Sequence, residues 1–385
     1  MSTRFDVIVI GGGPSGSSAA IGLTGGGMTV AIVERKQFPR EVMCGEFLSH
    51  EVIGAIRRFG LYDEFISLRP NKITSFAFIP ENGVRVVQPF GFEAWSLKRS
   101  LLDKMLLQGA VARGVTIIQP ADVISINRIQ NGYEVRCKTR QDQLSLSAGT
   151  VIAAYGKQSP LDKSLKRSFA SYRSGMSGVK YHVPRSVFAE SPDGAIQLFV
   201  GNGVYCGVNR VNENEATVCF LADSAKHAFH PKEALGILLQ KNRKFRALFQ
   251  VDLLSALPAF SPYGAGNIFF GKRNLVENGV YMIGDAAAVI APLAGDGIGM
   301  AIESGQLIAH VLKRAKQDSL DRLQTEILYT REWTRLFRKR LTVASFLQGI
   351  AMDSLGGNLG GRLMKTLPHL AERTIEWTRS QKGKR

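Results

Sequence analysis

A glycine-rich turn near the start of the chain has the residue types and spacing of a phosphate-binding loop. Gly11, Gly13 and Gly16 form the pattern G-x-G-x-x-G, after the apolar run of residues 5–10 and before a helix-compatible stretch at 17–23. In such a turn the first glycine permits a tight bend, the second lets the backbone approach a pyrophosphate, and the third lets the helix pack close to the strand. The N–H groups at the helix N-terminus then face the phosphates. The turn therefore predicts a dinucleotide site.

An acidic residue follows the next apolar run at the distance that ribose recognition requires. Residues 29–33 form that run, and Glu34 comes 18 residues after Gly16. A carboxylate in this position accepts hydrogen bonds from a ribose diol. Strand, glycines, helix and acid in this order favour a dinucleotide-binding unit over an ordinary glycine turn, but they do not distinguish FAD from NAD.

A second glycine-rich segment near the other end of the chain makes that distinction. Asp285 follows the apolar run 279–283, and Gly295 and Gly297 precede a helix that is expected to begin near Ile298. A carboxylate at a strand end can hold a sugar-alcohol hydroxyl. A helix N-terminus can stabilise the negative charge that a reduced flavin carries near N1 and the C2 oxygen. The two segments together indicate FAD.

In the order of these motifs the chain resembles the flavoprotein superfamily of para-hydroxybenzoate hydroxylase-type monooxygenases, geranylgeranyl reductases and flavin-dependent halogenases. The resemblance covers nearly the whole chain. It implies that Asp285 binds the ribityl chain, that Pro292 lies near the ring, and that Arg99 and, less firmly, Arg40 contact FAD. The expected cofactor-binding residues are Gly11, Gly13, Pro14, Ser15, Gly16, Glu34, Arg35, Arg40, Cys44, Gly45, Arg99, Asp285, Pro292, Gly295, Gly297 and Ile298.

Three segments decide how far the resemblance reaches. The hydroxylases carry an Asp-Gly pair where this chain has residues 155–159, so the acid is missing. Direct reduction by NAD(P)H is therefore in doubt, and a partner reductase is the alternative electron source. Residues 44–48 resemble both the Cys-Gly loop of the reductases and the Gly-Glu-x-Leu loop of the halogenases. Cys44 is there either a packing residue or an active-site thiol, and Glu46 is favoured as a hydrogen-bonding residue over a general base.

The third segment, residues 204–208, stands where the reductases and halogenases carry tryptophan-containing motifs over the substrate pocket. Both tryptophans are replaced here, and Tyr205 either faces substrate or fills the sheet. Lys72 is the one candidate for a halogenase lysine, and an exposed loop lysine is the favoured interpretation. The candidate catalytic residues are Cys44, Glu46 and Tyr205.

These motifs predict an α/β fold with a discontinuous, three-layer, Rossmann-like FAD-binding domain built on a parallel sheet. Residues 1–72, 92–165 and 270–316 are assigned to it. Residues 73–91 and 166–269 are rich in strand patterns and are assigned to an inserted, mostly antiparallel substrate-binding domain. Residues 317–385 are predicted to be a basic helical region. The Asn131-Gly132 pair between two strand patterns predicts a hairpin.

Bulk composition is ordinary apart from charge. Hydrophobic residues make up 45% of the 385 residues and charged residues 21%, while the formal net charge is +17. Residues 311–385 alone carry +9, with 16 Lys and Arg against 7 Asp and Glu. The cluster at Arg331, Arg335, Arg338, Lys339 and Arg340 is interpreted as a solvated helix face, with an anionic membrane, an acidic carrier or an electron-donor protein as the alternative partner.

Several classes of protein are disfavoured. The chain shows no nucleic-acid recognition motif, and its four cysteines have neither disulfide-scaffold character nor zinc-ligand spacing, so no metal site is expected. No apolar segment reaches the roughly 18 residues of a membrane span. A cytoplasmic location is expected, with association at a membrane surface as the alternative. The oligomeric state stays open.

The sequence thus predicts an FAD-dependent oxidoreductase with an apolar or aromatic small-molecule or carrier-linked substrate. A monooxygenase is slightly favoured, and a double-bond reductase or dehydrogenase like the geranylgeranyl reductases is the alternative. A halogenase and a membrane-surface electron-transfer flavoprotein are less favoured.

Overall fold

The computed structural model describes residues 3–190, 192–223 and 231–379, and within these ranges the strands form two eight-stranded sheets and a small two-stranded sheet. The first sheet is mostly parallel, because its β1, β2, β6, β9 and β17 strands pair in the same direction. Its path runs β16 (Val276–Glu277), β17 (Val280–Met282), β9 (Gln143–Ala153), β1 (Thr3–Ile10), β2 (Val30–Val33) and β6 (Thr116–Ile118). The small sheet is β15 (Gly271–Lys272) with β18 (Ala288–Val289).

Apolar β-branched residues explain the parallel core of the first sheet. All four residues of β2 are buried, as expected for a strand covered on both faces. Helices α1 (Pro14–Thr24), α4 (Arg99–Val111) and α9 (Gly297–Gln317) pack together, with α1 between the other two. The Ser18 hydroxyl donates to the Ile302 carbonyl oxygen at 2.8 Å and joins α1 to α9. The helices that follow the two glycine-rich segments therefore lie side by side.

The predicted hairpin at Asn131-Gly132 is confirmed. It joins β7 (Asp122–Ile129) to β8 (Gly132–Lys138), and β8 pairs in turn with the first half of β9. Strand β9 is therefore long enough to join two pairings, and its second half lies between β1 and β17.

The second sheet is antiparallel except where β4 and β11 run parallel. Its order is β14 (Tyr263–Ala265), β10 (Met176–Pro184), β13 (Glu215–Asp223), β12 (Val204–Arg210), β11 (Ala195–Gly201), β4 (Asn71–Pro80), β5 (Val86–Ser96) and β3 (Phe47–Leu48). Residues 47–48 of β3 and 92–96 of β5 belong to this sheet, although the sequence had assigned them to the FAD-binding domain. Alternating burial along β5 shows why the strand continues beyond residue 91.

Helices cover the remaining surfaces of the two sheets. Short helices α6 (Pro231–Lys241), α7 (Arg243–Arg246) and α8 (Leu253–Ala256) supply apolar side chains to a core behind the second sheet. The other short helices are α2 (His50–Arg58), α3 (Tyr62–Ser67) and α5 (Leu161–Ser164). Helices α2 and α3 lie between β3 and β4 in the chain, and α5 follows β9.

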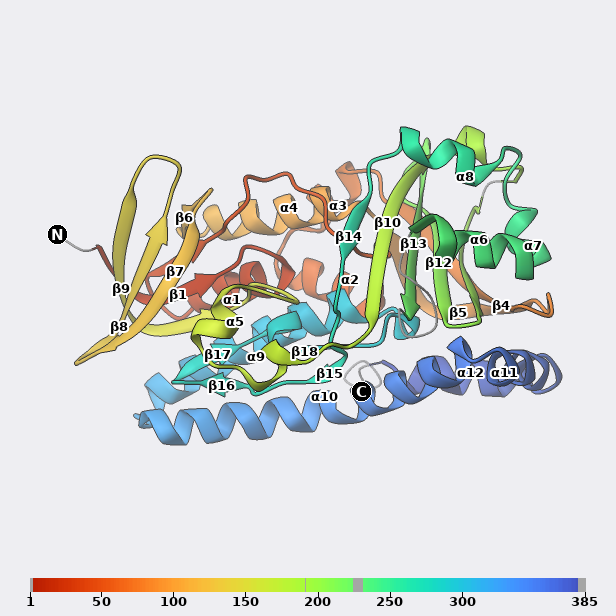
Figure 1. The fold of residues 1–385 in the computed structure, drawn as a ribbon. Helices are drawn as coiled ribbons and strands as arrows, with labels where there is room; N and C mark the ends of the chain where they lie inside the picture. The colour runs from red at the N-terminus through yellow and green to blue at the C-terminus, as the bar shows by residue number, and fades with distance from the viewer. Residues whose placement is uncertain (1–2, 191, 224–230, 380–385) are drawn as a thin grey trace.

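The C-terminal region is helical, as predicted, and it ties the two sheets together (Figure 1). Helix α10 (Arg322–Met352) runs beneath both sheets and is followed by α11 (Ser354–Thr366) and α12 (Pro368–Trp377). The Tyr329 hydroxyl donates to the Met282 carbonyl oxygen of β17, and the Met352 carbonyl oxygen accepts from Gly203 N–H beside β12. Within the described residues, no helix combines the length and apolar character needed to cross a bilayer.

Candidate functional site

A continuous cavity of about 1630 Å³ lies between the two sheets. Of the residues expected to bind a cofactor, Gly16 alone does not line it. The three candidate catalytic residues Cys44, Glu46 and Tyr205 line it as well. Ligand pockets commonly measure about 300 to 1,000 Å³, so this volume exceeds the need of one small ligand.

The first glycine-rich turn has no space for side chains at two positions. Gly11 has a φ of +108°, and a Cβ there would lie 2.4 Å from the Ala154 carbonyl oxygen. A Cβ on Gly16 would lie 1.9 Å from the Gly11 carbonyl oxygen, so Gly16 sits behind the loop and sets the approach of α1 to β1. Gly13 opens toward the cavity, with Arg40 nearby. The turn thus offers bare backbone N–H groups to an anion.

Glu34 closes the loop from the other side. Its Oε2 accepts from Gly12 N–H at 2.8 Å and its Oε1 from Lys36 N–H at 2.9 Å, which fixes a buried carboxylate at the cavity wall. Each oxygen keeps a further lone pair for a ribose hydroxyl. Arg35, which follows Glu34, also lines the cavity.

Two arginines share one buried carboxylate at this end of the cavity. Arg40 donates to Asp103 at 3.0 Å, and Arg99 donates to it twice, at 2.7 and 2.8 Å. Burial on its own would lower the pKa of Arg99, but Asp103 and the sulfur of Cys44 raise it overall. Asp103 was not among the residues predicted from the sequence, although its i, i+4 spacing from Arg99 on a helix was a usable signal. Asp103 holds both guanidinium groups for an anionic ligand.

The second glycine-rich segment lies across the cavity from the first. Asp285 pairs with Lys157 at 3.0 Å, and Pro292 begins a short turn that ends at Gly295 with a φ of +60°. Helix α9 then begins at Gly297 and presents its N-terminus to the cavity. Lys157 belongs to the segment that lacks the acid of the hydroxylases, so a cation occupies this part of the wall.

The FAD binding domain family matches residues 4–332. The chain belongs to this family. Its cofactor is FAD, and the protein is an FAD-dependent oxidoreductase. The residues present fit the cofactor, because the Gly11–Gly16 turn leaves a cradle that a single Cβ would fill and the Asp103 pair supplies two guanidinium groups beside it.

Two curated relatives of this flavoprotein are reductases. Menaquinone reductase of Mycolicibacterium smegmatis is 25% identical over 332 residues, which are 81% of this chain and 77% of that protein. Digeranylgeranylglycerophospholipid reductase 1 of Methanothermobacter thermautotrophicus is 24% identical over 336 residues, which are 82% and 78%.

Solved structures show the same fold. The flavin-dependent brominase Bmp2 has a TM-score of 0.79 at 18% identity, covering 98% of this chain and 93% of that chain. A geranylgeranyl bacteriochlorophyll reductase-like protein of Thermoplasma acidophilum has a TM-score of 0.69 at 18% identity, covering 98% and 100%. The predicted mixed α/β fold with a parallel and an antiparallel sheet is therefore confirmed.

The Cys44 loop of the flavoprotein is held by a buried charge cluster. Glu46 has a φ of +61° and is fully buried. Its Oε1 accepts from Arg99 N–H at 2.9 Å and from Lys180 Nζ at 2.8 Å, and its Oε2 lies 2.7 Å from His182 Nε2. Burial on its own would raise the pKa of Glu46, but His182 and Lys180 lower it to about 2. Glu46 is therefore an ionised hydrogen-bonding residue in the structure and not a free base.

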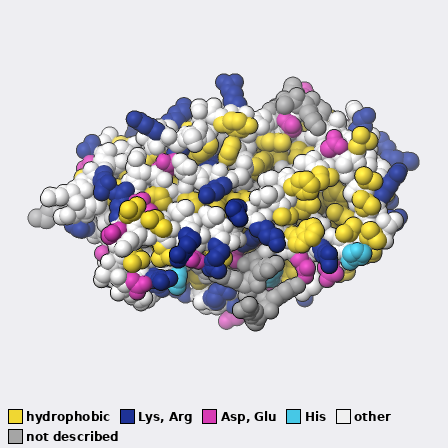
Figure 2. All heavy atoms as spheres, turned by 90° about the horizontal axis from the view of Figure 1, so that it is seen from below, with side chains coloured by type: hydrophobic (Ala, Val, Ile, Leu, Met, Phe, Trp, Pro, Cys, Tyr) yellow, Lys and Arg dark blue, Asp and Glu magenta, His cyan; other side chains and the backbone are white. Residues whose placement is uncertain are grey.

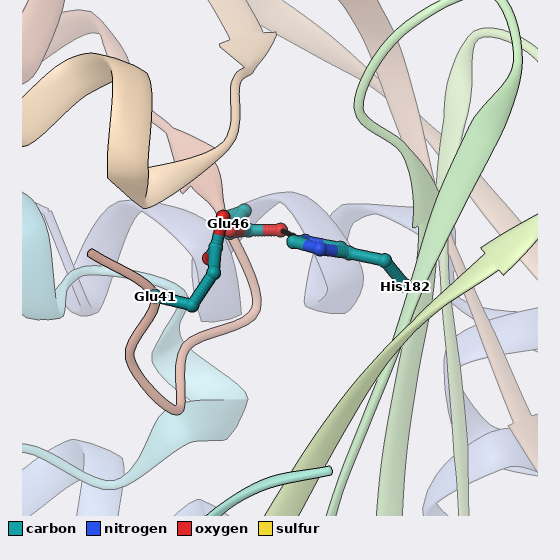
Figure 3. A group of neighbouring side chains, drawn as sticks. All are labelled: Glu41, Glu46 and His182. Atoms are coloured by element: carbon teal, nitrogen blue, oxygen red, sulfur yellow. Dashed lines mark hydrogen bonds and ion pairs between the residues drawn. The ribbon is translucent and has the colours of Figure 1, made fainter. Parts of the chain in front are cut away.

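Glu46 and His182, together with Glu41 of the same loop, point toward one another as the ligands of a metal ion would (Figure 3). Glu41, Glu46 and His182 bring ligand atoms within 4.8 Å of one another. Lys180 Nζ, however, lies 2.7 Å from Glu41 and 2.8 Å from Glu46. Since the Lys180 ammonium group already pairs with both carboxylates, the cation of this cluster is the protein's own lysine.

Tyr205 and Cys44 line the cavity near the second glycine-rich segment. The Tyr205 hydroxyl lies 3.4 Å from the Pro292 carbonyl oxygen, and burial raises the pKa of Tyr205, so the phenol keeps its proton at neutral pH. Cys44 is half-buried and accepts a hydrogen bond from Glu46 N–H at 3.3 Å. A catalytic role for either residue stays a prediction. Lys72 is exposed and does not line the cavity.

The structure corrects the predicted position of Arg340. The sequence placed it on a solvated basic face, but its side chain is buried and donates to Asp296 at 2.9 Å and to Glu303 at 2.5 Å. Asp296 directly precedes α9. Burial raises its pKa to about 7, and Arg340 and Arg379 oppose that rise. Helical periodicity alone does not predict this contact, because it depends on a long side chain of α10 reaching a carboxylate that is distant in the sequence.

Arg340→Leu should lower the free energy of unfolding by about 2 to 3 kcal/mol, because it leaves Asp296 buried without its main partner. Arg379 stays 3.7 Å from the other Asp296 oxygen and limits the loss. The matched control Arg338→Leu changes an exposed position of the same helix and should shift stability by less than about 0.5 kcal/mol. Urea unfolding measures both, and equal midpoints for the two variants would contradict the assigned ion pair.

Proposed function

We propose that this FAD-dependent oxidoreductase is a reductase that adds hydrogen across a carbon–carbon double bond of a long apolar, isoprenoid-like substrate. The shape and lining of the cavity carry the proposal. Beyond the flavin-facing segments, the cavity continues along the second sheet to α11, and its lining there includes Phe76, Phe78, Phe90, Ile196, Leu198, Leu221 and Met364. A wall of this kind suits a chain of hydrocarbon more than a compact polar ring.

The curated relatives support the same substrate class. Two enzymes that align over most of the chain are a menaquinone reductase and a digeranylgeranylglycerophospholipid reductase. The sequence slightly favoured a monooxygenase, and these relatives favour its alternative. A halogenase is further disfavoured because Lys72 lies outside the cavity.

The chain's own residues would position the substrate and supply a proton. Reduced FAD, when bound, supplies a hydride. The neutral Tyr205 phenol can donate a proton to the second carbon, which completes the addition of two hydrogens, and the Cys44 side chain lines the same cavity. The absence of the hydroxylase acid from residues 155–159 favours a partner reductase, with NAD(P)H as the alternative, as the source of the two electrons that restore the flavin.

Anaerobic turnover tests the proposal directly. The purified flavoprotein is reduced with dithionite under argon and mixed with a detergent-dispersed polyprenyl quinone or geranylgeranyl lipid. We expect flavin reoxidation together with a product that is two mass units heavier for each saturated double bond. Reoxidation that requires oxygen and yields an oxygenated product would support the monooxygenase and end the reductase proposal.

A tyrosine pair serves as the matched control. Tyr205→Phe should slow substrate-dependent reoxidation by about a hundredfold, as expected for loss of a general acid, without changing flavin content. Tyr181→Phe removes the hydroxyl of a buried tyrosine on β10 of the same sheet that does not line the cavity, and it should react like the unmodified protein.

A further inference from the structure

Helix α11 turns its large apolar side chains away from the protein. Leu355, Leu359, Leu363 and Leu367, here called the leucine row, recur every four residues at α11 and its C-cap, and they are 82, 60, 45 and 42% exposed. Leucines with this spacing normally face the core of a protein, because each buried side chain contributes about 1.5 to 3 kcal/mol. Here they form an apolar face with no cover in the described structure.

The opposite face of α11 packs so closely on the protein that the helix cannot rotate about its axis to bury the leucine row. Gly357 and Gly361 are buried against the protein. A Cβ on Gly361 would lie 2.7 Å from Pro80 Cγ of β4, and a Cβ on Gly357 would lie 2.8 Å from the Ala351 carbonyl oxygen. Small residues thus fix α11 close to the second sheet and hold the leucine row outward.

Other apolar side chains extend this face beyond the leucine row. Phe346 and Ile350 at the end of α10 are 67 and 40% exposed, and Trp377 of α12 is 44% exposed. Figure 2 shows hydrophobic side chains gathered at the end of the molecule where α11 and α12 lie, with Lys and Arg side chains around and beside them. A contiguous exposed apolar surface of this kind marks an interaction site.

Basic residues surround the apolar face. Arg338 and Lys339 lie toward it along α10, Arg362 and Lys365 lie on α11, and Arg373 lies on α12, all exposed. In the part of the chain that the structure describes, none of the five has an acidic partner within 4 Å. An apolar face bordered by free cations complements a bilayer that carries anionic headgroups.

The apolar face is continuous with the cavity. Ile350 is exposed and also lines the cavity, and Gly356, Gly360 and Met364 of α11 line it too. The helix that carries the leucine row on one side therefore forms cavity wall on another.

We propose that the leucine row, together with Phe346 and Ile350, docks the protein on an anionic lipid surface and that an apolar substrate enters the cavity there. The docking is independent of the reaction, and only the entry of substrate rests on the proposed function. The basic face predicted at 331–340 contributes through Arg338 and Lys339, while the apolar contact comes from α11 and the end of α10. A second copy of this chain is the competing occupant of the same face.

Vesicle co-sedimentation of the holoprotein tests the docking. Vesicles of phosphatidylcholine alone are compared with vesicles in which a quarter of the lipid is phosphatidylglycerol, at low and high salt. We expect binding to the anionic vesicles, weakened by salt. Leu355→Gln with Leu359→Gln should lower the partition coefficient at least about tenfold, because two side chains lose their contact with lipid. Arg362→Gln with Lys365→Gln should lower it by about fivefold per charge and reduce the salt effect.

The matched control changes an equally exposed apolar pair at the far end of α10. Leu323 and Ile327 are 65 and 58% exposed and also lie four residues apart, so their double glutamine variant should bind vesicles like the unmodified protein. The proposal fails if the unmodified protein does not bind anionic vesicles, or if the α11 variant binds as well as the control. It also fails if light scattering shows a dimer that the α11 variant dissociates while vesicle binding is unchanged.

Loss of vesicle binding is separable from loss of function. The α11 variant should keep its flavin and should turn over a short, water-soluble substrate at the unmodified rate, while its turnover of vesicle-embedded substrate falls with its partition coefficient. If no substrate is reduced by any variant but vesicle binding follows the α11 change, the proposed function fails and the docking surface stands.

Discussion

Gly16→Ala should yield protein without bound FAD. The added Cβ would lie 1.9 Å from the Gly11 carbonyl oxygen and 3.2 Å from Ala154 Cβ, so α1 must move away from β1. That movement displaces the backbone N–H groups that face the pyrophosphate. The turn binds the pyrophosphate through backbone N–H groups, so a change of side-chain conformation cannot restore binding. We therefore expect the flavin content after purification to fall to about a tenth or less. Absorbance of the isolated protein at flavin and protein wavelengths measures it.

Gly349→Ala is the control for the added methyl group. Gly349 lies inside α10 and is exposed, and a Cβ added there would meet no other atom within 4 Å. Alanine at this position should therefore leave the flavin content unchanged and add a little helix stability. Circular dichroism separates loss of flavin from loss of fold. A Gly16→Ala protein that is folded and fully yellow would show that the turn does not hold the pyrophosphate.

The features that sequence predicted well depend on backbone geometry. The G-x-G-x-x-G turn, the Asn131-Gly132 hairpin and the strand before Asp285 each rest on local glycine and apolar patterns, which fix nearby structure with little help from the rest of the chain. Parallel pairing of β9 with β1 and β17 then follows, because such sheets bring the carboxyl ends of their strands to one edge.

The features that sequence missed depend on side chains far apart in the chain. Lys180 lies 134 residues from Glu46, and no local pattern marks a lysine on an apolar strand as the partner of a buried carboxylate. Arg340 was misplaced for the same reason, since its carboxylate is 44 residues away. The leucine row was missed because sequence shows which face of a helix is apolar but not which face the glycines bring against a sheet.

Lys180→Met should lower the free energy of unfolding by about 3 to 5 kcal/mol at neutral pH. Lys180 is buried and is the shared counter-charge of Glu41 and Glu46. Without its ammonium group, two neighbouring carboxylates lose a partner and Glu46 has no access to water. The Cys44 loop should also become less ordered, because Glu46 accepts a hydrogen bond from the Arg99 backbone N–H and so holds the loop against α4. Urea unfolding of the holoprotein measures the stability, and flavin fluorescence reports the loop.

The pH dependence of Lys180→Met shows whether the lost charge is the cause of its lower stability. Glu46 has its pKa lowered from 4.5 to about 2, so its ionised form contributes stability above pH 4.5 that is lost as the pH falls toward 2. The shift corresponds to roughly 3 kcal/mol. Lys180→Met raises the pKa of Glu46, so the difference in stability from the unmodified protein should narrow as the pH falls through this window.

A surface pair and a double variant complete the test. Lys98→Met breaks an ion pair with Glu215 that is partly exposed, and it should cost at most about 1 kcal/mol. Glu46→Gln combined with Lys180→Met removes both charges of the fully buried pair and should be more stable than Lys180→Met alone, because only the partly exposed Glu41 is then left without its lysine. If the double variant is no more stable than the single one, or if the deficit of Lys180→Met is constant from neutral to acid pH, then packing of the lysine stem and not its charge holds the cluster together.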